Sequence, residues 1–357
     1  MQKNSAGMIG FILIAFWSCA LIIYLWLLRN STGNVRSKLV GMPLAFIHLF
    51  FARDGSWKKL SDPQETLMLA LKSGASAKRK RIYFIRHGES MWNQVFNRGL
   101  DLGIVWRFVS CVIQELQLLP FPDSVFWDSP LSPLGIRQAV QLSAWLEHAD
   151  KANQHAAVLR GDAASQSLIC TSNLRRSVST ILTSLSGRLL RSAKDQVFVL
   201  SSAQEVTRNI DGFSLSAMRG SPSPSWIELE QPELDKVVTA LYSVDRLDGT
   251  YNKGNKSLTS NGLKRMSEFA NWLFTSEAAI DFNTVILGGH SLWFKEFFKA
   301  FLPYGCKHEA KSKKIVNCGV IAFDLISLHG RFVIDPESLQ VVYGGFESKQ
   351  SLGGSKN

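Results

Sequence analysis

Two histidines in this chain each follow an apolar, strand-like run of residues. His87 comes after the run 82–85 (IYFI) and directly after Arg86. His290 comes after the run 284–287 (TVIL) and two glycines. A neutral imidazole is a nucleophile near neutral pH, and arginine carries forked donors that suit phosphate oxygens. These segments predict a site that binds a phosphorylated ligand and attacks it with a histidine.

A sheet must bring these side chains together, because about two hundred residues separate the two histidines. A third apolar run, at 167–170, is also typical of a buried strand. In an open α/β sheet, ligands bind at the carboxyl ends of the strands. A helix predicted from Ser172 through Thr180 places Arg176 near its positive end, where anions bind. The pattern therefore predicts an α/β fold with one phosphate site at the edge of the sheet.

The order of these motifs resembles that of the histidine phosphatase superfamily, the phosphoglycerate-mutase-like enzymes. The resemblance covers residues 81 to about 325 and implies a three-layer sandwich with a mostly parallel central sheet flanked by helices. In chain order, the matching segments are 86–90 with Asn93, 128–135 with Gln138, the serine-leucine-arginine segment ending at Arg176, Gly289-His290-Ser291, and the late strand 317–321.

The resemblance also implies a mechanism. The family's nucleophile falls on His87, which would attack phosphorus in line and become a phosphohistidine. The surrounding donors would neutralise the phosphoryl oxygens. The matching donors are Arg86, Arg176 and His290, with Asn93 as a further donor and Arg208 as either an added phosphate contact or an ordinary surface arginine.

The proton donor that the family supplies after a later strand falls on Glu205. A carboxyl kept protonated by burial could protonate the leaving oxygen and then activate water. The family commonly has a glycine soon after its glutamate, whereas here glycine occurs only at Gly212. Asp211 is therefore a rival acid.

The sequence gives no reason to expect a metal or another cofactor. It holds no cluster of Cys or His at metal-ligand spacing. The arginines would supply the positive charge that a magnesium ion supplies in other phosphoryl-transfer sites. We expect metal-independent chemistry.

Residues 8–28 form an uninterrupted stretch without a charged side chain. This stretch is long enough to span a bilayer, and it is longer than the apolar part of a usual signal peptide, which is the competing interpretation. The flanking basic residues favour a cytosolic catalytic domain; they are Lys3 before the span and Arg29, Arg36 and Lys38 after it. A sequon at Asn30 would become available in the opposite, luminal orientation. The four cysteines outside the span are scattered, which suits a reducing compartment.

The chain divides into an anchor, a juxtamembrane linker, a catalytic domain and a disordered tail. The apolar patch 39–51 in the linker either lies on a membrane or packs on the enzyme, and Pro43 argues against a smooth helix through it. The basic run 78–81 is either solvated or in contact with anionic lipid. The four parts are residues 1–30, 31–80, 81–345 and 346–357.

The composition agrees with an enzyme for anionic substrates. The formal net charge of +11 over 357 residues suggests anionic partners. No stacking motif accompanies the basic residues, so no nucleic acid is expected. Two long segments, 96–127 and 212–262, separate the motifs and are the expected determinants of substrate choice.

Together these features predict a membrane-anchored, metal-independent phosphatase that hydrolyses a phosphomonoester through His87. A phosphoglycerate-type mutase is the enzymatic alternative, because the sequence does not show whether water reaches the phosphohistidine. A catalytically weak scaffold that still binds phosphate is the alternative from another class of protein.

Overall fold

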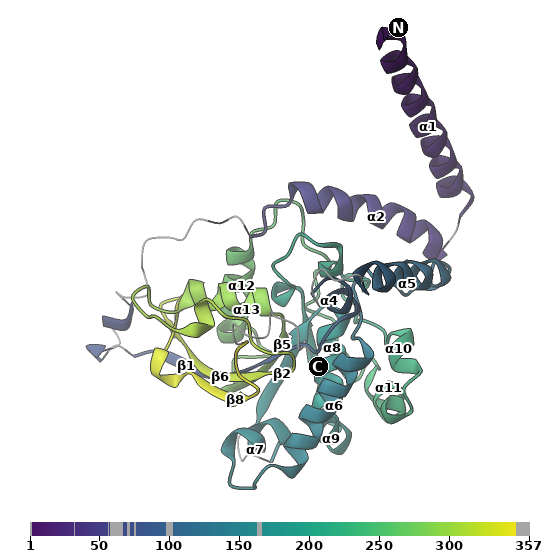
Figure 1. The fold of residues 1–357 in the computed structure, drawn as a ribbon. Helices are drawn as coiled ribbons and strands as arrows, with labels where there is room; N and C mark the ends of the chain where they lie inside the picture. The colour runs from purple at the N-terminus through teal and green to yellow at the C-terminus, as the bar shows by residue number, and fades with distance from the viewer. Residues whose placement is uncertain are drawn as a thin grey trace.

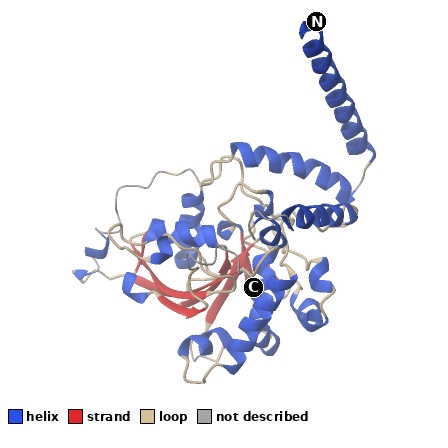
Figure 2. Ribbon diagram, in the orientation of Figure 1, coloured by secondary structure: helices blue, strands red, loops and turns tan. Residues whose placement is uncertain are grey.

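The computed structural model describes residues 2–31, 33–55, 57, 67–69, 72–74, 76–97, 103–162 and 166–347, with side chains from residue 16 onward. Helices cover both faces of one sheet (Figures 1 and 2). The strands are β1 (Lys78–Arg86), β2 (Ser167–Ser172), β3 (Val197–Leu200), β4 (Leu247–Asp248), β5 (Thr284–Gly289), β6 (Val320–Leu328), β7 (Arg331–Ile334) and β8 (Gln340–Tyr343).

The described helices follow the same chain order. The α-helices are α1 (Gln2–Asn30), α2 (Gly33–Phe51), α4 (Met91–Phe96), α5 (Gly103–Gln117), α6 (Pro133–His148), α7 (Gln154–Arg160), α8 (Arg175–Ser184), α9 (Ser186–Arg191), α10 (Trp226–Leu229), α11 (Asp235–Leu241), α12 (Gly262–Thr275) and α13 (Ser291–Phe301). The 3-10 turns are η1 (Ser201–Ala203), η2 (Ile210–Gly212), η3 (Pro232–Leu234), η4 (Glu309–Lys311) and η5 (Pro336–Ser338).

The α/β class is confirmed, but the expectation of a mostly parallel sheet is wrong. The strand order is β4-β3-β2-β5-β1-β6-β7, with β8 also paired to β6. The first five of these strands are parallel, whereas β6, β7 and β8 pair antiparallel. After α13 the chain returns to the carboxyl end of β1 before β6 begins, since the Cys318 amide donates to the Arg86 carbonyl oxygen. The strand that follows must therefore run backwards along β1, and the sheet is mixed.

The core has two apolar layers because the parallel strands are buried on both faces. Alternate residues of β1 point to opposite sides. Tyr83 and Ile85 pack with α6 and α8, whereas Ile82 and Phe84 pack with α12 and α13. The predicted three layers are therefore present, and the edge where the parallel strands end is left for the site.

The expected linker contributes structure to the body. Helix α2 runs straight through Pro43, contrary to the expectation of a break there. One of its faces packs on the body, where Gly41 faces the Trp127 ring and His48 lies against the ring of Phe213. Tertiary contacts of this kind stabilise a helix that its proline weakens.

A buried ion cluster holds the end of this segment. The Asp54 carboxylate is within 3.0 Å of Lys256 Nζ and 2.6 Å of Arg265 Nη2. The Asp54 carbonyl oxygen also accepts from the Gly262 amide at the start of α12. Residues 33–55 are therefore packed against the α/β body, ahead of the predicted boundary at residue 81.

Helix α1 extends away from the body (Figure 1). Among the residues that the structure describes, no helix is both long and apolar enough to cross a membrane. The side chains of residues 2–15, which include part of the predicted span at 8–28, lie outside the described set. Lys38, one of the charges used to predict orientation, is buried and donates to the Leu118 carbonyl oxygen.

The basic run 78–81 is part of β1, and three of its four side chains bind protein groups. Lys80 is buried and donates to the backbone oxygens of Ala279 and Ile280. Arg79 and Arg81 both pair with Asp324. These partners oppose the prediction that the run contacts anionic lipid.

The first two residues of the predicted disordered tail, 346–357, make contacts with the rest of the chain. Phe346 forms an isolated β-bridge with Ile315, and the Glu347 amide donates to the Lys314 carbonyl oxygen. Residues 346–347 therefore pack on the body, and the remaining predicted tail, residues 348–357, lies outside the described residues.

Candidate active site

The two histidines meet at the carboxyl ends of neighbouring strands. His87 follows β1 and His290 follows β5, and these strands are paired in parallel. The two imidazole rings lie 5.1 Å apart between centroids. The His87 amide also donates to the Gly289 carbonyl oxygen at 3.0 Å, which fixes the two loops to each other. The structure thus brings the two predicted site histidines together.

The hydrogen bonding of His87 determines which ring nitrogen is free to react. Its Nδ1 lies 2.6 Å from the Gly88 carbonyl oxygen. A carbonyl oxygen only accepts, so Nδ1 must carry the proton in the neutral ring. Burial, then Arg176 and Arg86, hold the pKa of His87 well below its ordinary value. The ring is therefore neutral, with the lone pair on Nε2.

His290 pairs with Ser172 through its Nε2. Ser172 Oγ lies 2.8 Å from His290 Nε2 and also accepts from the Leu174 amide. A hydroxyl can donate or accept, so the ring proton lies on Nδ1 in the tautomer in which Ser172 donates to Nε2. Within the described residues, the buried Nδ1 has no hydrogen-bond partner. In that tautomer, Nδ1 is an N–H donor beside the His87 ring, open to an oxygen of a ligand.

Two consecutive arginines at the start of α8 have different surroundings. Arg175 is a structural residue, because its guanidinium binds the Asp123 carboxylate and the Ser124 carbonyl oxygen. Arg176 is 2% exposed, and after burial of the imidazoles themselves its charge is the next cause that lowers the pKa of both histidines. Of these two arginines, Arg176 is therefore the one whose charge acts on the histidines.

Arg86 enters the site from the end of β1. Its charge also lowers the pKa of His87. One guanidinium nitrogen binds the Ile315 carbonyl oxygen and, at 2.7 Å, the Glu347 carboxylate. Its buried Nε has no partner among the described residues. Arg86 is thus fixed by the chain near residue 347 and keeps a donor for a ligand.

The loop that carries His87 is clamped by the start of α6. The Ser132 amide and hydroxyl bind the carbonyl oxygen and carboxylate of Glu89, and Gln138 accepts from the Glu89 amide. Ser132 also caps α6, because its Oγ accepts from the Gly135 amide. The 128–135 segment is therefore a scaffold for the loop that carries His87.

Gly135→Ala is expected to destabilise the protein by about 1–3 kcal/mol, the usual cost of overpacking. A Cβ at this position would lie 2.0 Å from the Glu89 carbonyl oxygen, so the clamp must shift. Thermal unfolding measures the change. The matched control is Gly55→Ala, whose new Cβ would meet its nearest atom at 3.9 Å. Equal unfolding temperatures for the two variants would contradict the close packing at Gly135.

Glu205 lies against the amino end of α13, the helix that begins just after His290. Its carboxylate accepts from the amides of Val206 (2.9 Å) and Trp293 (2.8 Å). Burial raises the pKa of Glu205 above its ordinary value, against the effect of Arg176. Lys256 lies behind it, donating to the Glu205 carbonyl oxygen, and burial lowers the pKa of this lysine to about 8.

Asp211, the rival acid, lies directly on Arg176. Its Oδ2 is 3.3 Å from Arg176 Nη2, and its carbonyl oxygen accepts from Nη1 at 2.6 Å. Burial raises the pKa of Asp211 as well, and Arg176 opposes this effect. Both candidate acids are therefore buried in the site, but Asp211 is the one paired with a permanent cation.

The remaining predicted donors are placed less favourably. Asn93 lies in the first turn of α4, and its Oδ1 accepts from Asn97. Arg208 is exposed on the segment between the two acids. The structure thus groups six predicted residues tightly and leaves Arg208 outside the buried cluster; the six are Arg86, His87, Arg176, Glu205, Asp211 and His290.

A bell-shaped dependence of kcat/KM on pH is expected from the opposite shifts of His87 and Glu205. Attack requires neutral His87, so the acid limb has its midpoint below the ordinary value of about 6.5. Proton donation requires neutral Glu205, so the alkaline limb lies above the ordinary value of about 4.5. Steady-state kinetics across pH test this shape. An acid limb centred above 6.5 would contradict the lowered pKa of His87.

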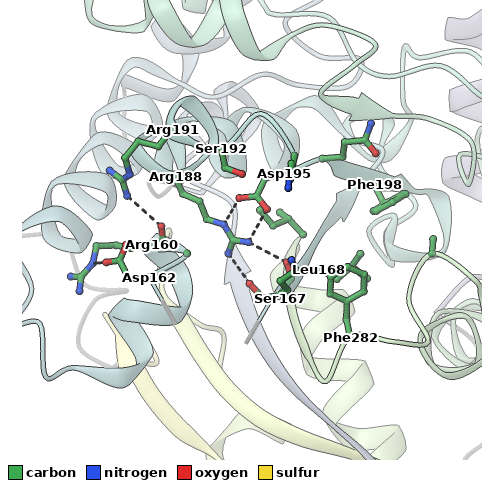
Figure 3. A pocket seen from close by; sticks show the side chains of 16 residues that line it. Arg160, Asp162, Ser167, Leu168, Arg188, Arg191, Ser192, Asp195, Phe198 and Phe282 are labelled. Carbon is green, nitrogen blue, oxygen red and sulfur yellow. Dashed lines mark hydrogen bonds and ion pairs between the residues drawn. The ribbon is translucent and has the colours of Figure 1, made fainter. Parts of the chain in front are cut away.

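A different cavity of about 430 Å³ lies at the amino ends of β2 and β3, opposite the histidines (Figure 3). Its arginines already have partners: Arg188 pairs with Asp195, and Arg160 pairs with Asp162. The cavity is separate from the edge of the sheet that carries the two histidines. Carboxylates already neutralise these two arginines, so they are not free to bind an anion there.

Several supporting residues were missed by the sequence reasoning. Ser172 binds His290 Nε2, and Lys256 with Asp54 forms the buried ion cluster behind Glu205. Ser172 ends the observed strand β2, two residues after the predicted strand 167–170, so its position was a usable signal. Lys256 and Asp54 are two hundred residues apart and carry no motif. In the part of the chain that the structure describes, no group of three His, Cys, Asp or Glu residues could hold a metal ion.

No family model and no curated protein matches the chain. Among solved structures, it is similar to a protein named mycobacterial hydrolase 1, with a TM-score of 0.36 and 16% identity over 76% of this chain and 100% of that chain. It is similar to phosphoserine phosphatase from Entamoeba histolytica in complex with 3-phosphoglyceric acid, with a TM-score of 0.34 and 16% identity over 76% and 99% of the two chains.

A third similar structure is phosphoglycerate mutase from Bacillus anthracis, with a TM-score of 0.36 and 14% identity over 72% of this chain and 92% of that chain. The chain is thus similar to proteins of the phosphatase and phosphoglycerate mutase kind. At this level of similarity, the chemistry of the chain has to be inferred from its own site.

Proposed function

We propose that this protein is a metal-independent phosphatase that hydrolyses a phosphomonoester through a phosphohistidine at His87. The observation that carries the proposal is the 2.6 Å contact between His87 Nδ1 and the Gly88 carbonyl oxygen. This contact leaves a lone pair on Nε2 of a neutral ring, which is the form that attacks phosphorus. Arg176 and Arg86 provide the charge that a phosphate dianion needs.

The proposed reaction has two steps, formation of the phosphohistidine and its hydrolysis. His87 Nε2 attacks phosphorus, the bond from phosphorus to the ester oxygen breaks, and Glu205 gives its proton to the leaving alkoxide. Water then attacks the phosphohistidine and gives a proton to the Glu205 carboxylate, the bond from phosphorus to Nε2 breaks, and inorganic phosphate leaves. Arg176, Arg86 and the Nδ1 proton of His290 stabilise the phosphoryl oxygens throughout.

Phosphate release from a panel of phosphomonoesters in EDTA tests this function. The panel includes p-nitrophenyl phosphate, phosphoserine and both monophosphoglycerates. Release that is undiminished by EDTA supports a metal-independent phosphatase. Exchange between the phosphoglycerates without net release would support the mutase instead. A folded protein that binds phosphate but releases none from any ester would support the scaffold alternative.

Glu205 rather than Asp211 is the proposed proton donor, because Asp211 is paired with the permanent charge of Arg176. Glu205→Gln is expected to lower kcat/KM for an alkyl phosphate about 10²–10⁴-fold, the range of general acid catalysis. The kcat/KM for p-nitrophenyl phosphate should fall much less, since its leaving group needs no proton and kcat/KM does not include the later attack by water. Values of kcat/KM for both esters measure the difference. The same leaving-group dependence in Asp211→Asn, and its absence in Glu205→Gln, would reverse the assignment.

We also propose that residues 8–28 anchor the protein in a membrane with the enzyme on the cytosolic side. The proposal rests on the uncharged stretch in the sequence. On the described part of α1, large apolar side chains such as Trp17 and Trp26 are well exposed. Full-length protein should stay with membranes in alkaline carbonate, and a protease added outside should spare the enzyme. Extraction by carbonate, or glycosylation at Asn30, would contradict the anchor or its orientation, respectively.

A further inference from the structure

An apolar pocket of about 280 Å³ lies between α2, α4 and α5, which gather at one end of the molecule (Figure 1). Its walls are apolar or aromatic except for one amide side chain. Four of its rings contact one another in a chain of neighbours. The lining residues are Met42, Ala45, Phe46 and Leu49 of α2, Trp92 and Phe96 of α4, Phe108 of α5, and Phe126, Asn209 and Ile210.

Two structural elements join this pocket to the phosphate site. Helix α4 begins four residues after His87, and its Trp92 lines the pocket. The turn η2 presents Ile210 to the pocket and the next residue, Asp211, to the Arg176 guanidinium. A ligand bound by its phosphate at Arg176 therefore has an apolar wall on the adjoining side.

The surface around the pocket is also apolar. Phe46 and Phe108, which line it, are 58% and 44% exposed, so the pocket opens outward. The outer faces of α2 and α5 carry further exposed apolar side chains, including Phe50, Trp106 and Ile113. Large exposed apolar patches mark protein or membrane interaction sites or ligand-binding grooves.

The residues that line the pocket favour a hydrocarbon chain over a peptide segment as the bound group. A peptide segment carries backbone N–H and C=O groups that need partners when buried. The pocket offers only the Asn209 side chain among its described lining residues. A hydrocarbon chain has no such requirement, and its burial is favourable in proportion to area.

We propose that the pocket binds the hydrocarbon tail of an amphiphilic phosphomonoester whose phosphate is bound at His87 and Arg176. This inference rests on the proposed phosphatase function and names its substrate class, a lipid-like phosphate ester. The alcohol released by the reaction would keep its tail in the pocket while inorganic phosphate leaves from the phosphate site at His87 and Arg176.

Ethyl and octyl phosphate test the inference, assayed with the full-length protein in phosphatidylcholine vesicles. Each methylene that leaves water should raise kcat/KM by up to about fourfold until the pocket is full. Phe46→Asp puts a charge on the pocket wall and should reduce the octyl-to-ethyl ratio about tenfold or more. Phe50→Asp is the matched control: it lies one turn further on the same helix, is 70% exposed and does not line the pocket.

The outcomes separate the two proposals. A ratio that stays high in Phe46→Asp would reflect partition of the ester into the bilayer and would overturn the pocket. Hydrolysis of both esters at equal kcat/KM would overturn it and leave the phosphatase function standing. If neither alkyl ester is hydrolysed but the phosphomonoester panel is, the pocket is overturned and the phosphatase function stands. If no ester is hydrolysed at all, the proposed function fails, and calorimetry with octylphosphonate and ethylphosphonate decides the pocket. Tighter octylphosphonate binding that Phe46→Asp abolishes supports the tail site, and equal binding overturns it. A dimer that dissociates in Phe46→Asp would assign the pocket to a second copy and would also overturn it.

Discussion

His87→Ala is expected to lower phosphate release at least about a thousandfold, because the first chemical step loses its nucleophile. The neighbouring His290 does not replace it, since His290 Nε2 is already paired with Ser172 Oγ at 2.8 Å. The measurement is phosphate release from p-nitrophenyl phosphate in EDTA at pH 7. The fold of the variant is verified by circular dichroism and thermal unfolding.

His148→Ala is the matched control for this variant. His148 is exposed, and its ring bonds the backbone of its own helix at Ala144. This change should leave phosphate release within about twofold, as is usual for surface substitutions away from a site. A folded His87→Ala protein with wild-type turnover would rule out the proposed nucleophile.

Arg176→Ala is expected to lower kcat/KM about 10²–10³-fold, the range for removing one preorganised donor from a transition-state site. Arg176 supplies a buried, fork-shaped cation, and its removal also leaves Asp211 without its partner. Inorganic phosphate should inhibit the variant more weakly, because the same donors bind the product. The measurements are kcat/KM and the inhibition constant for phosphate.

Arg175→Ala separates this effect from simple loss of an arginine. Arg175 is buried against Asp123 and Asp128 and does not carry its charge to the ligand. Its removal should destabilise the fold by about 3–5 kcal/mol, the cost of breaking a buried ion pair. Arg176→Lys should restore part of kcat/KM, because it keeps the charge but not the fork. An Arg176→Ala enzyme with unchanged kcat/KM and phosphate inhibition would contradict the assigned role.

The parallel half of the sheet was predictable because its strands carry strong local signals. The run 82–85 is apolar at every position, as expected for a strand buried on both faces, and a short polar or glycine segment ends it. The same signals placed His87, His290 and Arg176 at one edge. These residues come within a few positions after a strand. Their place in the sequence therefore also determines their place in the fold.

The antiparallel strands and the position of the expected linker were not predictable in this way. β6 reads as an ordinary core strand, and its direction depends on where the preceding segment crosses the sheet. Helix α2 contains Pro43, which local rules disfavour, and it is retained by contacts with residues far along the chain, such as Trp127. The apolar pocket between α2, α4 and α5 depends on the same contacts, since α2 supplies one of its walls. Local patterns cannot reveal a surface that forms only when distant segments pack.

The measurement that tests the central claim most directly is the trapping of the phosphoenzyme. Full-length protein is mixed with a labelled phosphomonoester in EDTA and quenched within milliseconds in alkali, and the labelled peptide is identified. The account predicts acid-labile, alkali-stable phosphate on His87, absent in His87→Ala and turned over at the rate of phosphate release. Steady release of phosphate without any labelled His87, or with the label on another residue, would contradict it.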